Sequence, residues 1–189
     1  METPLSQKQS LDIIRDMISS SRKNYSYNAR YFLIWGWLIL AAALIQYLAI
    51  ILRWDFNTLY TWGAAIAMGG ILQTIAIMKD TREKQATTFV DRCLTALWGG
   101  SAGVFFILML IGFQYGWISI YPLMITVYGW GVLVTGALIR FRPLIIGGIA
   151  NFFIAGVSVF VVTPELILLL ILSLLVSYIA PAYMLRKTA

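Results

Sequence analysis

The sequence predicts an all-α integral membrane protein with six transmembrane helices, and three features carry this prediction. Hydrophobic residues make up 60% of the 189 positions and charged residues 12%, whereas a soluble domain carries roughly 25% charged residues. The apolar residues gather in long runs, and the first run, residues 31–52, contains no charged residue. An α-helix needs about 20 such residues to cross a hydrocarbon core of about 30 Å. Finally, basic residues flank these runs almost entirely on one predicted side.

Residues 1–30 precede the first run and predict a separate amphipathic helix, cytoplasmic or lying at the membrane interface. Ser6 and Gln9 fit a capping box, which satisfies free backbone N–H groups at a helix start. Four apolar residues then recur at helical spacing, which predicts a short helix over roughly residues 7–22: Leu11, Ile14, Met17 and Ile18. Such a helix either lies along the interface under the bundle or docks a protein partner. The mixed charge of this segment also differs from a secretory signal peptide.

The transmembrane domain is predicted over residues 31–189, with short polar connections between its spans. The six spans are expected at about residues 31–52, 58–78, 93–113, 119–139, 143–162 and 165–185. Asn57 is placed to cap the second span. Pro122 and Pro143 fall in first turns, where a missing N–H costs nothing. Pro164 and Glu165 form a start signal for the last span.

The distribution of basic residues predicts the orientation. If the N-terminus is cytoplasmic, Arg53 is the one residue among the 14 Lys and Arg that falls on the outer side. Cytoplasmic connections carry the excess of Lys and Arg, so the sequence predicts a multi-pass protein of the bacterial inner membrane with both termini cytoplasmic. The net charge of +6 follows from this topology, and no nucleic-acid partner is expected.

Internal alignments predict that the spans form three helical hairpins of the same orientation. Trp35-Gly36 aligns with Trp98-Gly99, which relates the first two hairpins. Gly99-Gly100 aligns more weakly with Gly147-Gly148, which brings in the third. An alternative alignment, of the first span with the fourth, would give an inverted three-plus-three repeat of the transporter kind.

This layout, with Trp-Gly near the inner start of successive spans and short outer loops, resembles small six-helix bacterial inner-membrane proteins that include the HdeD acid-resistance type. The resemblance covers residues 31–187 in layout. It implies an inner-membrane protein without established chemistry, and it carries no functional residue over to this chain.

The composition argues against most catalytic chemistry. The chain has no histidine and one cysteine, Cys93, so haem axial histidines, the usual zinc sites, a Ser-His-Asp triad and an intramolecular disulfide are excluded. Proton-coupled transporters normally carry ionisable groups within their spans, and none lies away from the span ends here. We expect Asp80, Glu83 and Asp91 to pair with neighbouring cations on solvated helix faces. The sequence therefore predicts a protein that is not an enzyme and has no metal or cofactor. A lipid-modifying enzyme at the inner interface is the weakest hypothesis.

Neutral polar residues within the spans are the candidates for a cavity. Each buried amide is first expected to form an interhelical hydrogen bond, which contributes about 0.6–2 kcal/mol. The functional alternative is a cavity for a small or amphipathic molecule, lined by Asn151, Tyr128 and Trp130 together with Gln46 and Gln73.

Two further sets of residues have both a structural and a functional interpretation. Basic residues at the inner interface are explained by topology, or else they bind anionic lipid headgroups: Lys79, Arg82, Arg92, Arg140 and Arg142. Gly99 and Gly103 form a GxxxG pattern, which predicts packing inside the bundle or, alternatively, a homodimer interface.

The leading functional hypothesis is a non-enzymatic polytopic membrane protein that binds a protein partner at its cytoplasmic face or a lipid. The amphipathic N-terminal segment and the basic connection of residues 79–92 favour it. The alternative hypothesis is a facilitator or carrier of a neutral or apolar small molecule, with its cavity near Asn151.

Overall fold

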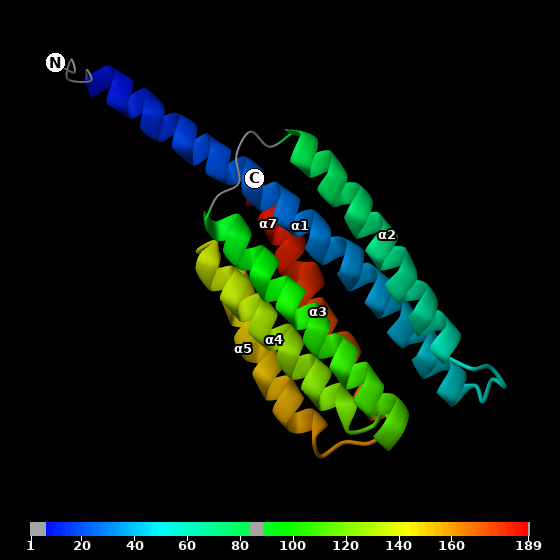
Figure 1. Cartoon of the computed structure of the whole chain (residues 1–189). Coiled ribbons are helices and arrows are strands. Elements are labelled where there is room, and N and C mark those ends of the chain that lie inside the picture. Colours follow the sequence, from blue (N-terminus) through cyan, green and yellow to red (C-terminus); the bar gives the residue numbers. More distant parts are fainter. Residues whose placement is uncertain (1–6, 84–88, 189) are drawn as a thin grey trace.

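The computed structural model describes residues 7–83 and 89–188, with side chains for residues 29–80 and 89–187. These residues are helical or lie in short connections. The helices are α1 (Gln7–Ile51), α2 (Leu59–Glu83), α3 (Phe89–Tyr115), α4 (Ile120–Leu138), α5 (Arg142–Ser158), α6 (Glu165–Leu174), the π-helix η1 (Leu175–Ile179) and α7 (Ala180–Thr188). The last three follow one another without a break. Successive rods run antiparallel, so the connections alternate between the two ends of the bundle (Figure 1).

The chain is a multi-pass membrane protein. Five stretches are long and apolar enough to cross a membrane: Ala29–Ile51, Leu59–Asp80, Phe89–Tyr115, Ile120–Leu138 and Glu165–Lys187. Helix α5 is also apolar, but its 17 residues give a length of only about 26 Å at the usual rise of 1.5 Å per residue. It ends at Ser158, earlier than the predicted fifth span, because a β-branched run leads into Pro164 and both features disfavour helix.

Helix α1 differs from the prediction of a separate N-terminal helix. It is one continuous helix of 45 residues, whose last part is the span Ala29–Ile51. No Gly or Pro precedes Gly36 within it, so nothing interrupts the ladder of backbone hydrogen bonds. Figure 1 shows α1 extending beyond the bundle at the end where the chain's C-terminus lies. The apolar stripe from Leu11 to Ile18 lies outside the described side chains.

Three predicted helix-start signals are confirmed. The side chain of Asn57 accepts a hydrogen bond of 3.0 Å from the backbone N–H of Leu59 and so caps α2. Pro122 lies in the first turn of α4, and Pro143 lies in the first turn of α5.

Helices α4 and α5 form the closest helix pair of the bundle, and glycines permit their approach. Arg140, in a left-handed conformation with φ 55°, closes the short connection between them. A methyl group placed on Gly148 would lie 2.6 Å from Leu133 Cβ, and one on Gly129 would lie 2.8 Å from Asn151 Cβ. A side chain at either position would collide with the neighbouring helix, so these glycines fix the distance between α4 and α5.

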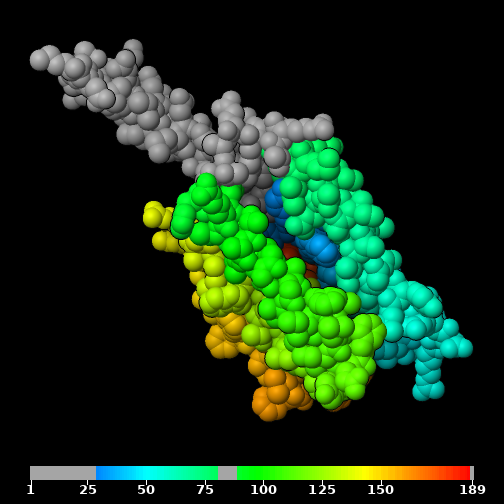
Figure 2. Space-filling model, viewed as in Figure 1, coloured from blue at the N-terminus to red at the C-terminus, as the bar shows by residue number. Residues whose placement is uncertain are grey.

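Helices α2 and α3, in contrast, lie at the periphery. Helix α2 packs against α1, and α3 packs against α4, but no close backbone contact joins α2 to α3 in the described part of the chain. In the most apolar stretch of each, 17% of the residues are buried, against 56% in the C-terminal span. Figure 2 shows the surface hollowed between α2 and α3, with α1 visible at the base of the hollow.

Candidate functional site

Gln46 joins three helices by hydrogen bonds. Its side-chain oxygen, on α1, accepts 2.8 Å hydrogen bonds from the indole N–H of Trp62 on α2 and from the hydroxyl of Tyr121 on α4. This arrangement is the interhelical bonding that was expected of a buried amide. Because two donors depend on one oxygen, Gln46 is a structural joint of the bundle.

Replacing Gln46 by leucine should destabilise the protein by about 1–3 kcal/mol, because the half-buried indole N–H of Trp62 and the buried hydroxyl of Tyr121 lose their acceptor. Thermal or SDS-induced unfolding in micelles measures this change. Thr74→Val is the matched control, since the Thr74 hydroxyl bonds to Gly70 O of its own helix and its loss should stay within about 0.5 kcal/mol. Equal stability of the two variants would contradict the role assigned to Gln46.

A second joint connects α1 to α2 and is here called the first indole joint. The ring of Trp35 covers Gly69, where an added methyl group would lie 2.8 Å from the ring. The indole N–H of Trp35 donates to the side-chain oxygen of Gln73, one turn further along α2. The amide of Gln73 therefore holds a packed tryptophan by a hydrogen bond between the two helices.

A matching arrangement, here called the second indole joint, connects α3 to α4. The ring of Trp98 covers Gly131, where an added methyl group would lie 2.9 Å from the ring. The indole N–H of Trp98 donates to Thr135 Oγ1 at 3.1 Å, again one turn beyond the covered glycine. The first two helix pairs are thus fastened by the same chemistry.

Asn151 lies at the contact between α5 and the π-helix η1. It is fully buried, and its Nδ2 donates to Ser177 Oγ at 3.0 Å. Among the described residues, neither its Oδ1 nor Ser173 Oγ has a hydrogen-bond partner. Gly147 also meets this region, where an added methyl group would lie 3.0 Å from Ser177 Cα. Asn151 is therefore enclosed by close packing.

The π-helix has a local cause in the sequence. The backbone N–H of Ala180 bonds to Leu175 O, five residues earlier, and the next residue, Pro181, has no N–H to donate. The wider turn places Ser177, Tyr178 and Ile179 together in the interior. π-turns within helices often occur at functional sites, and this one orients the partner of Asn151.

Tyr128 belongs to an aromatic cluster in the core. Its ring lies 4.8 Å from that of Phe105 and 5.4 Å from that of Tyr178. Tyr178 in turn contacts Phe32 at 5.1 Å and Trp98 at 6.1 Å. The cluster joins α1, α3, α4 and η1, so Tyr128 and Asn151 serve two different contacts.

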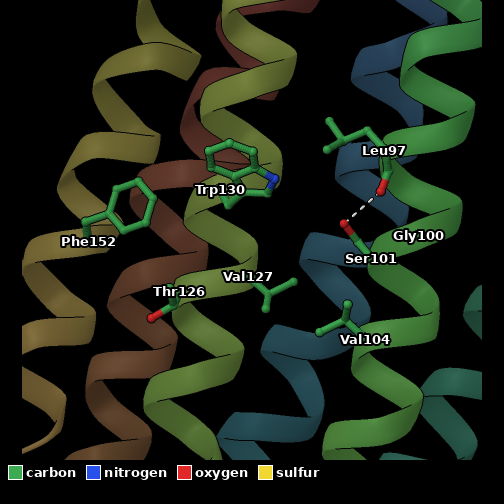
Figure 3. A pocket seen from close by; sticks show the side chains of 8 residues that line it. All are labelled: Leu97, Gly100, Ser101, Val104, Thr126, Val127, Trp130 and Phe152. Atoms are coloured by element: carbon green, nitrogen blue, oxygen red, sulfur yellow. Dashed lines mark hydrogen bonds between the residues drawn. The ribbon is translucent and has the colours of Figure 1, made fainter.

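Trp130 lies on the outer surface of the bundle, with 54% of its surface exposed. It lines a groove of about 520 Å³ between α3 and α4 (Figure 3), formed by Leu97, Gly100, Ser101, Val104, Thr126, Val127, Trp130 and Phe152. The Ser101 hydroxyl donates to Leu97 O, so the groove presents a largely apolar wall. The five residues predicted to line one cavity therefore lie in separate places.

Asp80 forms a buried ionic contact at the end of the bundle that holds the C-terminus, here called the basic end. Only 3% of Asp80 is exposed. Its Oδ1 lies 3.2 Å from Arg30 Nη1, and its Oδ2 accepts a 2.6 Å hydrogen bond from the Tyr31 hydroxyl. Because Arg30 and Tyr31 belong to α1, this contact fastens α2 to α1 where α1 leaves the bundle.

The expectation of a solvated helix face was wrong for Asp80. Helix α2 continues to Glu83, so Asp80 keeps the helical phase of Gly69, Gln73 and Ala76 and faces α1 with them. That spacing of four, three and four residues was present in the sequence and could have revealed the contact. Asp91 is partly exposed, whereas the side chain of Glu83 lies outside the described residues.

The candidate headgroup residues that the structure describes are all exposed: Lys79, Arg92, Arg140 and Arg142. They lie at the basic end, at the ends of α2, α3, α4 and α5 (Figure 1). The side chain of Arg82 lies outside the described range. Within that range no group of three or more Cys, Asp or Glu residues could hold a metal ion.

Gly99 and Gly103 correct a further expectation. Both are exposed, and a methyl group on either would meet no atom of the described residues within 4 Å. The expectation that this glycine pair packs inside the bundle is therefore wrong, because their side of α3 faces away from α4. The glycines that do permit close helix contact are Gly129, Gly136 and Gly148 on α4 and α5.

Comparisons with known proteins give no relative. No protein-family model, no curated protein and no solved structure matches the chain. The resemblance to HdeD-type proteins accordingly rests on the layout of the sequence.

Proposed function

We propose that the chain is a non-enzymatic membrane protein with six spans and both termini in the cytoplasm of a bacterial cell, and that it acts by binding a protein partner. The partner docks on the N-terminal segment of α1 through Leu11, Ile14 and Ile18. Short outer connections leave this cytoplasmic side as the larger surface available to a protein.

The continuity of α1 is the observation that carries the proposal. One helix of 45 residues contains both the docking segment and the span Ala29–Ile51. Within the bundle α1 contacts α2, α6, η1 and α7, and Asp80 braces it at Arg30 and Tyr31. A force or rotation applied to the docking segment would therefore reach the centre of the bundle without a hinge.

Binding of a lipid is the second candidate function, favoured by the groove shown in Figure 3. Its volume of about 520 Å³ lies within the range of about 300–1,000 Å³ that is usual for small-molecule sites. Its apolar lining around Trp130 suits an acyl chain, and Arg92 lies near the start of one of its helices. Basic residues at the membrane surface attract anionic lipid headgroups.

A carrier for small molecules has less support. It was expected to use a cavity shared by Asn151, Tyr128 and Trp130, but Asn151 is enclosed, Tyr128 is stacked in the aromatic cluster and Trp130 faces outward. The groove beside Trp130 and a second groove along α2 are both open at the surface of the described chain.

The test is native mass spectrometry of the protein extracted gently from its own membranes. The wild type should retain a protein of defined mass. The double variant Ile14→Gln with Ile18→Gln should retain at least about tenfold less of this protein than the wild type does. Glutamine keeps a high helix propensity, so α1 should persist while its apolar stripe is removed.

The control variant, Arg15→Gln with Asp16→Gln, changes the opposite face of the same helical turns and should retain the partner. Partner retention in the Ile14/Ile18 variant would contradict the docking role. A retained lipid of defined mass in place of a protein would select the second candidate function.

A further inference from the structure

The two indole joints place the pairs α1–α2 and α3–α4 in the same register. In each joint the acceptor follows the covered glycine by one helical turn. The same number of positions separates Gly69 from Gly131 and Gln73 from Thr135. Each residue of α2 therefore has an equivalent on α4, with the same direction relative to the partner helix.

This equivalence relates a covered face of α4 to an uncovered face of α2. The equivalent pairs are Ala67 with Gly129, Gly70 with Val132, Ile71 with Leu133, and Thr74 with Gly136. On α4 this face packs against α5, and the closest approach is at Gly148 of α5. On α2 the same positions line an open groove of about 420 Å³, formed by Ile66, Ala67, Gly70, Ile71, Thr74 and Ile75.

The arrangement of the three helix pairs shows which contact is missing. The second helix of the middle pair, α4, packs on the first helix of the last pair, α5. The C-terminal rod, α6 to α7, packs on α1, the first helix of the first pair. The corresponding contact of α2 with α3 is absent in the described chain, and Figure 2 shows a hollow at that place.

Helix α3 offers the other half of this missing contact. Gly99, Ala102 and Gly103 are exposed on the side of α3 that faces away from α4, and no atom lies within 4 Å of a methyl group on either glycine. Small residues let helices approach closely in hydrocarbon, where no hydrophobic effect drives their association. The chain thus carries two exposed faces with small residues, and the equivalent of the α2 face, on α4, packs against the next helix of the chain, α5.

We propose that these two faces form the interface of a homodimer, in which the α2 groove of each copy binds the Gly99–Gly103 side of α3 in the other. Every copy supplies both halves of the interface, so a two-fold axis along the membrane normal satisfies both contacts at once. At the basic end Lys79 on α2 and Asp91 on α3 carry opposite charges and would lie at the same depth. Acyl chains can cover any apolar face, so they account less well for two matching small-residue faces.

Disulfide cross-linking in native membranes tests the dimer. Cys93 is the only cysteine, so Cys93→Ser gives a background without thiols, into which Ile71→Cys and Gly99→Cys are introduced together. Disulfides need Cβ atoms about 3.5–4.5 Å apart. Oxidation should convert most of the protein into a covalent dimer. Met68→Cys with Val104→Cys is the matched control, because both residues are exposed outside the proposed interface, and it should remain monomeric.

Three results would overturn the proposal. A cross-link within one chain would mean that α2 closes on its own α3. Equal dimer yields from both cysteine pairs would indicate random collision. If no cross-link forms although both thiols react with a maleimide reagent, the two faces contact lipid and form no dimer interface.

A second measurement does not depend on cysteines. Gly70→Leu with Gly99→Leu should weaken dimerisation at least tenfold in single-molecule photobleaching counts, with unchanged thermal unfolding of the monomer. Both glycines have free space within 4 Å, so the bundle should still fold. A folded variant with undiminished dimers would overturn the proposal as well.

Discussion

Replacing Gly148 by alanine should lower the free energy of unfolding by about 3 kcal/mol or more, the largest effect expected of a single methyl group in this protein. The added carbon would lie 2.6 Å from Leu133 Cβ and 2.7 Å from both the Cα and the N of Leu133. Overpacking usually costs about 1–3 kcal/mol when side chains can move aside. Here the obstacle includes the backbone of α4, so the whole helix must shift.

The matched control is Gly100→Ala on α3, where an added methyl group meets nothing within 4 Å. Alanine favours helix over glycine by about 1 kcal/mol, so this variant should be as stable as the wild type or slightly more stable. Circular dichroism during thermal unfolding in a fixed detergent compares the two. If Gly148→Ala unfolds together with Gly100→Ala, the close α4–α5 contact does not exist in solution.

The transmembrane segments could be predicted from the sequence because their signal is local. Long uncharged runs reflect the length of a helix that crosses hydrocarbon, and Asn57 or Pro143 act within a single helical turn. The start of α1 could not be predicted in the same way. Its polar segment and its span were assigned to separate helices, but the polar sequence contains no residue that stops a helix.

The roles of individual residues depended on helical phase and on the neighbouring helices, which local patterns do not contain. Gly99 and Gly148 have the same glycine-rich surroundings in the sequence, yet Gly99 is exposed and Gly148 is covered by Leu133. Hydrogen bonds between helices were expected for buried amides in general. The two donors to the Gln46 side chain, however, lie on helices that only the tertiary fold brings together. Trp130 was assigned to the interior although its neighbours Gly129 and Gly131 take the inward positions.

Removing Arg30 should destabilise the protein more than removing Asp80, although the two residues form one ion pair. In Arg30→Ala the Asp80 carboxylate stays buried, with 4% of its side chain exposed, and keeps the Tyr31 hydroxyl as its partner. An uncompensated buried charge costs about 3–5 kcal/mol. Because the Arg30 side chain is 48% exposed and solvent already screens the pair, we expect about 2–3 kcal/mol.

Asp80→Ala should cost about 1 kcal/mol, because the guanidinium of Arg30 is about half exposed and its charge stays hydrated without the carboxylate. The double variant should be nearly as stable as Asp80→Ala alone, since without the Asp80 carboxylate the loss of Arg30 leaves no buried charge uncompensated. A double-mutant cycle by SDS-induced unfolding in mixed micelles measures this coupling. An Arg30→Ala variant that is no less stable than Asp80→Ala would mean that Asp80 is solvated. The brace between α1 and α2 would then not transmit a movement of the N-terminal segment to the bundle.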